Sequence, residues 1–156
     1  MMIARTWQAS SRKGVAPGGQ ICFSDTIWPG GPEAYIFQQV LQMIPGAVAL
    51  PRDVLDPPDT GVGFHAIQVN KYDPVQWPAP LPHKDSGNAG ISWMIVMGEF
   101  QGGAFHIQER PPPARPTTIT QCNRWICFDG LHEHWADPIT HGTRYSVIAF
   151  RFAEDR

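Results

Sequence analysis

Five short segments after residue 60 constrain the fold of this chain most, because each follows the period-two pattern of a β-strand. All five are rich in Val, Ile, Phe, Trp or Tyr, the residues that favour strands. They span residues 64–72, 91–97, 104–108, 124–128 and 144–152. Short strands separated by turn residues are typical of a jelly roll or a small barrel. We therefore predict a mainly β, jelly-roll or cupin-like barrel over residues 60–152.

A helix is expected ahead of these strands, over residues 32–44. Pro32 and Glu33 suit its first turn, where proline loses no hydrogen bond and an acidic side chain favours the helix dipole. Pro45 and Gly46 end the pattern. Its predicted apolar stripe consists of Ile36, Val40 and Ile44, flanked by Phe37 and Leu41.

The rest of the chain is expected to connect or cover this core. A length of 156 residues suits one domain, so residues 1–156 are predicted to form a single unit. Residues 1–31 are rich in Gly, Ser and polar side chains, and should run over the surface or add an edge strand. Two proline-rich stretches, residues 73–82 and 110–120, are expected to be functional loops. The pair Gly102-Gly103 predicts a tight hairpin turn.

Composition limits the surroundings and the partners of the chain. Hydrophobic residues form 42% and charged residues 17%, as in an ordinary globular protein. No apolar run approaches the roughly 20 residues of a membrane span, and the first residues do not resemble a secretory signal. Three cysteines without a close pair indicate reduced thiols. We expect an intracellular protein, cytoplasmic or nuclear, whose net charge of -2 gives no bulk attraction for nucleic acid.

Two short motifs are candidates for a metal site. In His83-Lys84-Asp85 the outer residues share one face of an extended chain, so the imidazole and the carboxylate converge. With a distant histidine they would form the 2-His-1-carboxylate triad that binds iron(II) and leaves positions open for other ligands. Either His132 or His134 could be that third ligand. The H-x-D spacing alone is common by chance, so the prediction depends on the neighbouring motifs.

A basic residue near the end of the chain indicates a binding pocket. Arg144 and Ser146 open the last strand and share a face with apolar residues. A guanidinium on an inward face is unfavourable unless it binds an anion, and its planar fork matches a carboxylate. Arg151 lies seven positions later and should point to the opposite face. One of these two arginines is therefore expected to point inward.

A third motif, Asn70-Lys71-Tyr72, precedes the loop that leads to His83. Asn70 and Tyr72 share a face, and their amide and phenol could contact the same carboxylates or simply form a strand end. In the loop, Trp77 could stack on a substrate ring or cover the mouth of the barrel.

Together these motifs resemble the iron(II)/2-oxoglutarate dioxygenase superfamily. The order N-x-Y and then H-x-D is similar to that of AlkB-type nucleic-acid demethylases. The stretches PHKDSGNAGISWMIVMGEFQGGAFHI and FDGLHEHWADPITHGTRYSVIAF resemble small dioxygenase domains of fungi, algae and phages that are related to the TET/JBP oxidases of thymine and methylcytosine. The resemblance covers about residues 64–152 and implies a double-stranded β-helix.

The resemblance also implies roles for single residues. His83 and Asp85 would be the proximal iron ligands, and the spacing F-D-G-x-x-x-H selects His134 as the distal one. Arg144, helped by Ser146, would hold the far carboxylate of 2-oxoglutarate. Asn70 and Tyr72 would contact the co-substrate or the substrate, and Asn88 and Trp77 would contact the substrate.

The implied activity is hydroxylation of an unactivated C–H bond with iron(II), 2-oxoglutarate and O₂. A pyrimidine methyl group in nucleic acid is one implied substrate, while a small molecule or a protein side chain stays open. A non-catalytic, cupin-like module that senses metal or 2-oxoglutarate is the alternative. A cupin reading of His132-x-His134 has only Asp137 as a nearby acid, and the glycine spacing fits it poorly.

Overall fold

The computed structural model describes residues 20–23, 32–50, 62–75 and 81–153. Its secondary structure consists mainly of antiparallel strands, with one helix, α1, in the part of the chain described. The elements in chain order are β1 (Gln20–Phe23), α1 (Pro32–Gln42), β2 (Ala47–Ala49), β3 (Val62–Phe64), β4 (Ala66–Tyr72), β5 (Asn88–Met97), β6 (Phe100–Gly102), β7 (Phe105–Gln108), β8 (Thr117–Ile119), β9 (Ile126–Asp129), β10 (Glu133–Ala136), β11 (Ile139–Gly142) and β12 (Arg144–Phe152).

The largest sheet has five strands in the order β1-β4-β12-β5-β9. All its neighbouring strands are antiparallel, and β12 lies at its centre between β4 and β5. As predicted for one alternative, part of residues 1–31 adds an edge strand, because β1 pairs with β4. Four of the predicted strands contribute to this sheet, at residues 64–72, 91–97, 124–128 and 144–152. They correspond to β4, β5, β9 and β12, and residue 64 itself belongs to β3.

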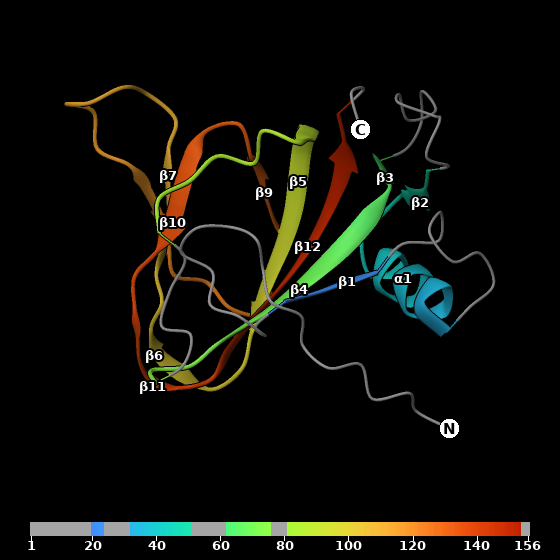
Figure 1. The fold of residues 1–156 in the computed structure, drawn as a ribbon, viewed down its shortest axis with the longest axis horizontal. Coiled ribbons are helices and arrows are strands. Elements are labelled where there is room, and N and C mark those ends of the chain that lie inside the picture. The colour runs from blue at the N-terminus through green and yellow to red at the C-terminus, as the bar shows by residue number, and fades with distance from the viewer. Residues whose placement is uncertain (1–19, 24–31, 51–61, 76–80, 154–156) are drawn as a thin grey trace.

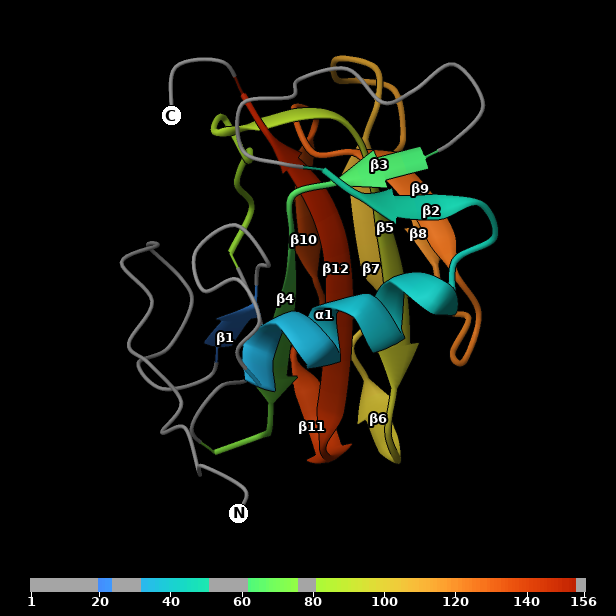
Figure 2. The same ribbon diagram turned by 90° about the vertical axis from the view of Figure 1, so that its right-hand side faces the viewer.

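Helix α1 covers one face of the five-stranded sheet, where it crosses β4, β12 and β5 (Figure 2). Phe37, Leu41 and Ile44 are buried against Ile67 and Ala149 of the sheet. The predicted helix is confirmed, although it ends at Gln42 rather than at residue 44. The apolar stripe is rotated from the predicted one: Ile36 is 41% exposed, whereas Phe37 is fully buried. The stripe therefore follows Phe37, Leu41 and Ile44.

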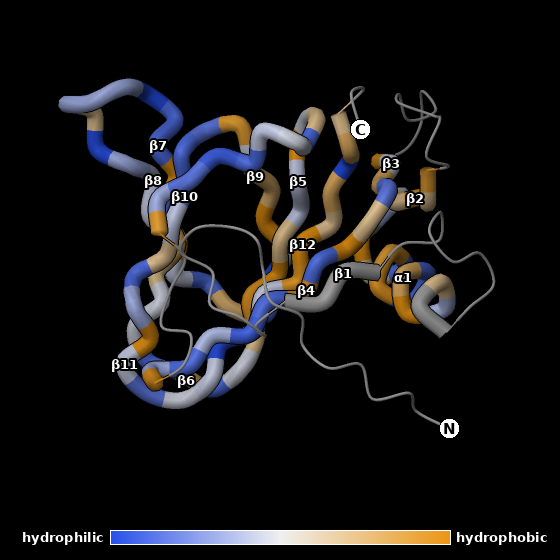
Figure 3. The backbone as a smooth tube through the Cα atoms, in the orientation of Figure 1, coloured by the Kyte–Doolittle hydropathy of each residue, from blue (hydrophilic) through white to orange (hydrophobic). Residues whose placement is uncertain are grey.

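The opposite face of the same sheet looks toward a second, smaller layer (Figure 1). This layer contains the sheet β10-β7-β8, and the pair β11-β6 continues it toward one end. The connection from β7 to β8 is mostly hydrophilic (Figure 3). By contrast, a second apolar cluster lies between the layers. The members of the cluster are Met94, Val96, Phe105, Ile107 and Phe128. This cluster packs the two layers together on the side of the main sheet that faces away from α1 (Figure 2).

The Gly102-Gly103 pair differs from its prediction. Both glycines have positive φ, +80° and +70°, as a tight turn requires. However, β6 pairs with β11 and β7 pairs with β10 and β8, so the two strands that flank the turn do not pair with each other. The glycines carry the chain from one two-stranded pair to the next sheet rather than closing a hairpin. The predicted hairpin was wrong because local turn chemistry does not specify strand partners.

Two further expectations concern the loops and the membrane. The predicted loop at residues 110–120 contains a short strand, β8 (Thr117–Ile119), that pairs with β7. Residues 76–80 of the other loop, including Trp77, lie outside the described residues. Within the described ranges, no helix combines the length and the apolar character needed to cross a bilayer.

Candidate metal centre and anion pocket

Three predicted ligands, His83, Asp85 and His134, meet at one point between the two layers. One ligand atom from each lies within 4.8 Å of the others. Nε2 of His83 is 3.7 Å from Oδ1 of Asp85, and Nε2 of His134 is 3.4 Å from Oδ2. These distances exceed the usual length of a hydrogen bond. Asp85 and His134 are only 6% and 4% exposed, so the cluster is largely shielded from water.

Backbone hydrogen bonds fix the positions of these three residues. His83 and His134 form an isolated antiparallel bridge, in which each N–H donates to the carbonyl of the other, at 3.1 and 2.9 Å. The N–H of Asp85 donates to the carbonyl of Gly130 at 2.8 Å. His83 is therefore hydrogen-bonded to β10, and Asp85 to the β9–β10 connection. This pairing keeps His83 and Asp85 on one face, as their i, i+2 spacing predicted.

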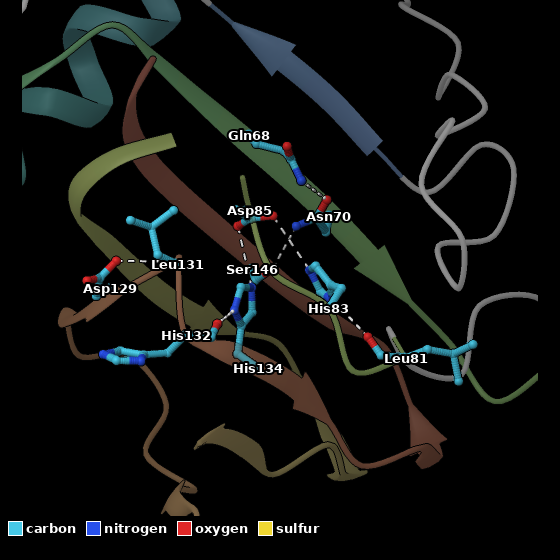
Figure 4. Close-up of polar contacts among 10 residues, drawn as sticks. All are labelled: Gln68, Asn70, Leu81, His83, Asp85, Asp129, Leu131, His132, His134 and Ser146. Carbon is cyan, nitrogen blue, oxygen red and sulfur yellow. Dashed lines mark hydrogen bonds and ion pairs between the residues drawn. The ribbon is translucent and has the colours of Figure 1, made fainter. Parts of the chain in front are cut away.

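The histidine rings are oriented for metal binding. Nδ1 of His83 lies 2.7 Å from the carbonyl oxygen of Leu81, and Nδ1 of His134 lies 2.8 Å from that of His132. A carbonyl oxygen only accepts, so each Nδ1 carries a hydrogen, and Nε2 is the ring nitrogen that can bind a metal. Both Nε2 atoms face Asp85 (Figure 4). Two imidazoles and one carboxylate that converge in this way form a suitable donor set for a divalent metal.

The structure separates His132 from His134. The His132 ring points away from the cluster, and this residue contributes only its backbone carbonyl (Figure 4). Next to it, the carboxylate of Asp129 accepts a 2.9 Å hydrogen bond from the N–H of Leu131 and so caps the turn. The turn places His134 beside His83.

The predicted co-substrate residues line the same cavity as the three candidate ligands. These are Asn70, Tyr72, Arg144 and Ser146, and they come from the facing strands β4 and β12. Apolar side chains close the other walls, including Phe105 and Phe128, whose rings lie 5.9 and 5.2 Å from the ring of His134.

Arg144 is the most unusual residue of this cavity. It is only 2% exposed, and within the described ranges its Nε has no hydrogen-bond partner. Its guanidinium lies over the ring of Tyr72, with Cζ 5.3 Å from the ring centroid. Burial lowers the pKa of Arg144, and the nearby Tyr72 and Cys122 oppose this shift. A buried cation of this kind provides a site for an anion, and its fork fits a carboxylate.

Three other polar residues lie beside the site or apart from it. Asn88 does not line the cavity; its backbone N–H donates to the carbonyl of Asp85. Arg151 is also absent from the lining, and a side chain at Gly90 would clash with it. Gln68, which the sequence analysis missed, is buried in the cavity wall. Its place two residues before Asn70 on a period-two strand was the signal that could have found it.

Comparison with known proteins gives information on the fold alone. No protein-family profile matches the sequence, and no curated protein matches it. Among solved structures, a prolyl-4-hydroxylase from Pseudomonas putida superposes with a TM-score of 0.57 and 12% identity over 94% of this chain and 77% of that one. OsALKBH1 superposes with a TM-score of 0.56 and 12% identity over 93% and 84%.

A third structure, the 2-oxoglutarate complex of the viral collagen prolyl hydroxylase of Paramecium bursaria Chlorella virus-1, gives a TM-score of 0.50. Its identity is 18% over 87% of this chain and 78% of that one. This chain spans only 41% of a 2OG-Fe(II) oxygenase from Burkholderia pseudomallei and 34% of NgTET1, which was solved with 5mC DNA; both superpose at 0.47. The fold of this chain is therefore similar to that of the two prolyl hydroxylases and of OsALKBH1.

Proposed function

We propose that this chain is an iron(II)- and 2-oxoglutarate-dependent dioxygenase that hydroxylates an unactivated C–H bond. The observation that carries the proposal is one cavity with two features at once. It holds the converging donor atoms of His83, Asp85 and His134, and it holds the buried guanidinium of Arg144. A metal site alone would fit many functions, whereas a metal site beside a carboxylate-binding arginine fits an oxygenase that uses a keto acid.

The donor set fits iron(II). His83, Asp85 and His134 would hold it, with both Nδ1 hydrogens fixed by backbone carbonyls so that each Nε2 is ready to bind. Three protein ligands leave coordination positions open for other molecules. When bound, iron(II) would supply the activation of O₂ that is coupled to decarboxylation of 2-oxoglutarate and to hydroxylation of the substrate.

The other end of the cavity fits the distal carboxylate of 2-oxoglutarate. Arg144 would grip that carboxylate with its fork, and the unpaired Nε of this buried side chain supports the assignment. Ser146, two residues along the same strand, would add a hydrogen bond, and Tyr72 holds the guanidinium from one side. Asn70 would contact the co-substrate or the substrate. The apolar rings of Phe105 and Phe128 would exclude bulk water from this region.

We further propose that the two layers close into a double-stranded β-helix and that residues 1–156 act as one domain. Two observations support closure. The His83–His134 bridge joins the segment after β4 to β10, and β6, which follows β5, pairs with β11, which precedes β12. The protein would then position substrate at the open end of the barrel. Trp77 and Asn88 remain the candidate substrate contacts that the sequence resemblance implies.

The sequence resemblance makes a pyrimidine methyl group the first substrate to test. A methylated oligonucleotide, a free nucleobase, another small molecule and a protein side chain are the competing candidates. The partners common to all of them are 2-oxoglutarate and O₂.

The test begins without oxygen. Addition of iron(II) and 2-oxoglutarate to the protein should produce a weak visible absorption band, because the band requires both to bind at one centre. His83→Ala should abolish the band, and His141→Ala should keep it, because His141 is exposed on β11. Loss of the band in both variants, or its absence in the parent protein, would contradict the proposed site.

Oxygen is then added, and succinate is measured with and without methylated oligonucleotides. Iron- and oxygen-dependent succinate is the expected result. A band without any succinate for every candidate substrate would instead favour the non-catalytic sensor.

A further inference from the structure

Three buried polar side chains of the cavity wall form one hydrogen-bonded chain. Nε2 of Gln68 donates to Oδ1 of Asn70 at 2.8 Å, and Nδ2 of Asn70 donates to Oγ of Ser146 at 3.2 Å. The three residues are 6%, 3% and 2% exposed. They lie in a row across β4 and β12 (Figure 4).

The direction of this chain determines where the Ser146 hydrogen points. Because Gln68 donates to the amide oxygen of Asn70, the Asn70 nitrogen faces Ser146. Oγ of Ser146 is therefore an acceptor in this bond, and its own hydrogen is available for another acceptor. Among the described residues, Asn70 is the hydrogen-bond partner of the Ser146 side chain, and it acts as the donor. The hydrogen is thus available to the cavity, where Arg144 favours an anion.

Gln68 itself lies too far away to contact a carboxylate held by Arg144. In the strand register, Tyr72 pairs with Arg144, Asn70 with Ser146, and Gln68 with Ile148. Four residues of an extended strand separate Gln68 from Tyr72, about 13 Å at the usual rise per residue. A hydrogen-bonding effect of Gln68 on the distal carboxylate must therefore pass through Asn70 and Ser146.

We propose that Gln68 is a positioning residue that keeps the Ser146 hydroxyl in the donor state for 2-oxoglutarate. The proposal rests on the proposed function. An amide is needed at position 68 because its N–H fixes the orientation of the Asn70 amide. The Asn70 amide in turn leaves Ser146 no acceptor except the anion in the cavity.

The substitution Gln68→Glu reverses the chain. An ionised carboxylate only accepts, so the Asn70 amide would rotate and present its nitrogen to residue 68. Its oxygen would then face Ser146 and accept the hydroxyl hydrogen. The hydroxyl would be lost to the co-substrate, although Ser146 and Arg144 are both still present.

The experiment measures the dissociation constant of 2-oxoglutarate by anaerobic absorption titration of the iron(II)-loaded protein. Gln68→Glu and Ser146→Ala should each weaken binding about tenfold or more, the effect of losing one hydrogen bond to a charged group. Iron(II) affinity should stay at the parent value. In turnover, KM for 2-oxoglutarate should rise with little change in kcat. Gln101→Glu, which adds the same charge at an exposed site on β6, is the matched control and should change nothing.

The double variant Gln68→Glu/Ser146→Ala distinguishes the loss of the Ser146 hydrogen bond from direct repulsion between the new carboxylate and 2-oxoglutarate. Without the Ser146 hydroxyl, the orientation of the Asn70 amide cannot change a hydrogen bond to 2-oxoglutarate. The double variant should therefore bind 2-oxoglutarate no more weakly than Ser146→Ala. If Gln68→Glu weakens binding as much in the Ser146→Ala background as in the parent, simple repulsion is the cause and the inference is wrong.

Gln68→Met covers the case in which the glutamate variant does not fold. It removes the donor without adding charge, so binding should be weaker than in the parent and unchanged when it is added to Ser146→Ala. Parent-like affinity in Gln68→Met overturns the inference. A parent protein that fails to bind 2-oxoglutarate with iron(II) contradicts the proposed function instead, so the two failures are distinguishable.

Discussion

At the scale of single residues, two histidines of one short segment have different surroundings. His134 points its Nε2 at Asp85, whereas the His132 ring turns away and only its carbonyl takes part, as the acceptor for Nδ1 of His134. The residues alone left these two histidines as alternatives and the family resemblance favoured His134; the structure places the His134 ring, and not the His132 ring, in the cluster (Figure 4).

We predict that His134→Ala abolishes iron(II) binding, because it removes one of three donor atoms. His132→Ala should keep iron(II) affinity within a few fold of the parent, because the carbonyl that orients His134 belongs to the backbone. Anaerobic iron(II) titration of both variants provides the measurement. Equal loss of affinity in the two variants would show that the His132 side chain also binds the metal.

Arg144 should reduce the stability of the protein without ligands. A buried guanidinium whose Nε has no hydrogen bond carries a desolvation penalty that the Tyr72 ring only partly offsets. We expect Arg144→Met to raise the free energy of unfolding of the metal-free protein by about 1 kcal/mol, since methionine fills similar space without charge. The same variant should weaken 2-oxoglutarate binding by about 100-fold or more, because a bidentate contact is lost.

Urea denaturation measures the first effect, and the anaerobic titration measures the second. Arg144→Lys serves as the control, since it keeps the charge but loses the planar fork. It should bind 2-oxoglutarate better than Arg144→Met and less well than the parent. A metal-free Arg144→Met protein that is less stable than the parent would show that Arg144 is a structural residue.

At the scale of elements, local pattern predicted the long strands and the four-residue strands β7 and β9, and missed other short ones. β4, β5 and β12 have seven to ten residues, and all three were predicted. β6, β10 and β11 have three or four residues each and contain glycine, histidine or charged side chains. They are strands because partners distant in the sequence supply their hydrogen bonds, and a local window does not contain those partners.

The same distinction applies to the candidate site. The i, i+2 rule placed His83 with Asp85, Arg144 with Ser146, and Asn70 with Tyr72 on common faces, and the structure brings all six to one cavity. The rule is silent on how separate strands meet, so it gave no reason to select Gln68 or to connect it with Ser146. The His83–His134 bridge could not be predicted either, because it joins a segment without regular secondary structure to β10, which lies about 50 residues later in the sequence.

One glycine couples the β6–β7 connection to the candidate anion site. A Cβ at Gly103 would lie 2.5 Å from Cδ1 of Ile139 and 3.0 Å from Cδ of Arg144, and its φ is +70°. Gly103→Ala should therefore destabilise the protein by about 2–4 kcal/mol, from backbone strain and overpacking, and should also weaken 2-oxoglutarate binding. Gly46→Ala is the matched control: its φ is +73°, but nothing lies within 4 Å of the added carbon.

Gly46→Ala should lose only about 1–2 kcal/mol from strain and should bind 2-oxoglutarate like the parent. Denaturation and anaerobic titration of the two variants check both parts. Equal stability losses and equal affinities would mean that Gly103 does not constrain Arg144.

At the scale of the whole molecule, the two faces of the main sheet have separate tasks. One face is packed by α1 through Phe37 and Leu41, and it contributes none of the residues that line the cavity. The other face presents Asn70, Ser146 and Arg144 to the smaller layer. Substitutions under the helix should therefore change stability, whereas substitutions between the layers should change binding.

Metal binding should stabilise the whole chain, because its three ligands come from two segments that are distant in the sequence. Iron(II) that binds the folded chain and not the unfolded one stabilises it by about 2.7 kcal/mol at a free concentration 100 times the dissociation constant. For a chain of this length that corresponds to a rise in Tm of about 5–10 °C.

Anaerobic calorimetry should show this rise, a chelator should reverse it, and 2-oxoglutarate should add to it only when the metal is present. Asp85→Asn should show a much smaller rise, because it removes the carboxylate from a cluster whose other two candidate ligands are imidazoles. If iron(II) raises the Tm of Asp85→Asn as much as that of the parent, the stabilising ion binds elsewhere and the assignment of this centre is wrong.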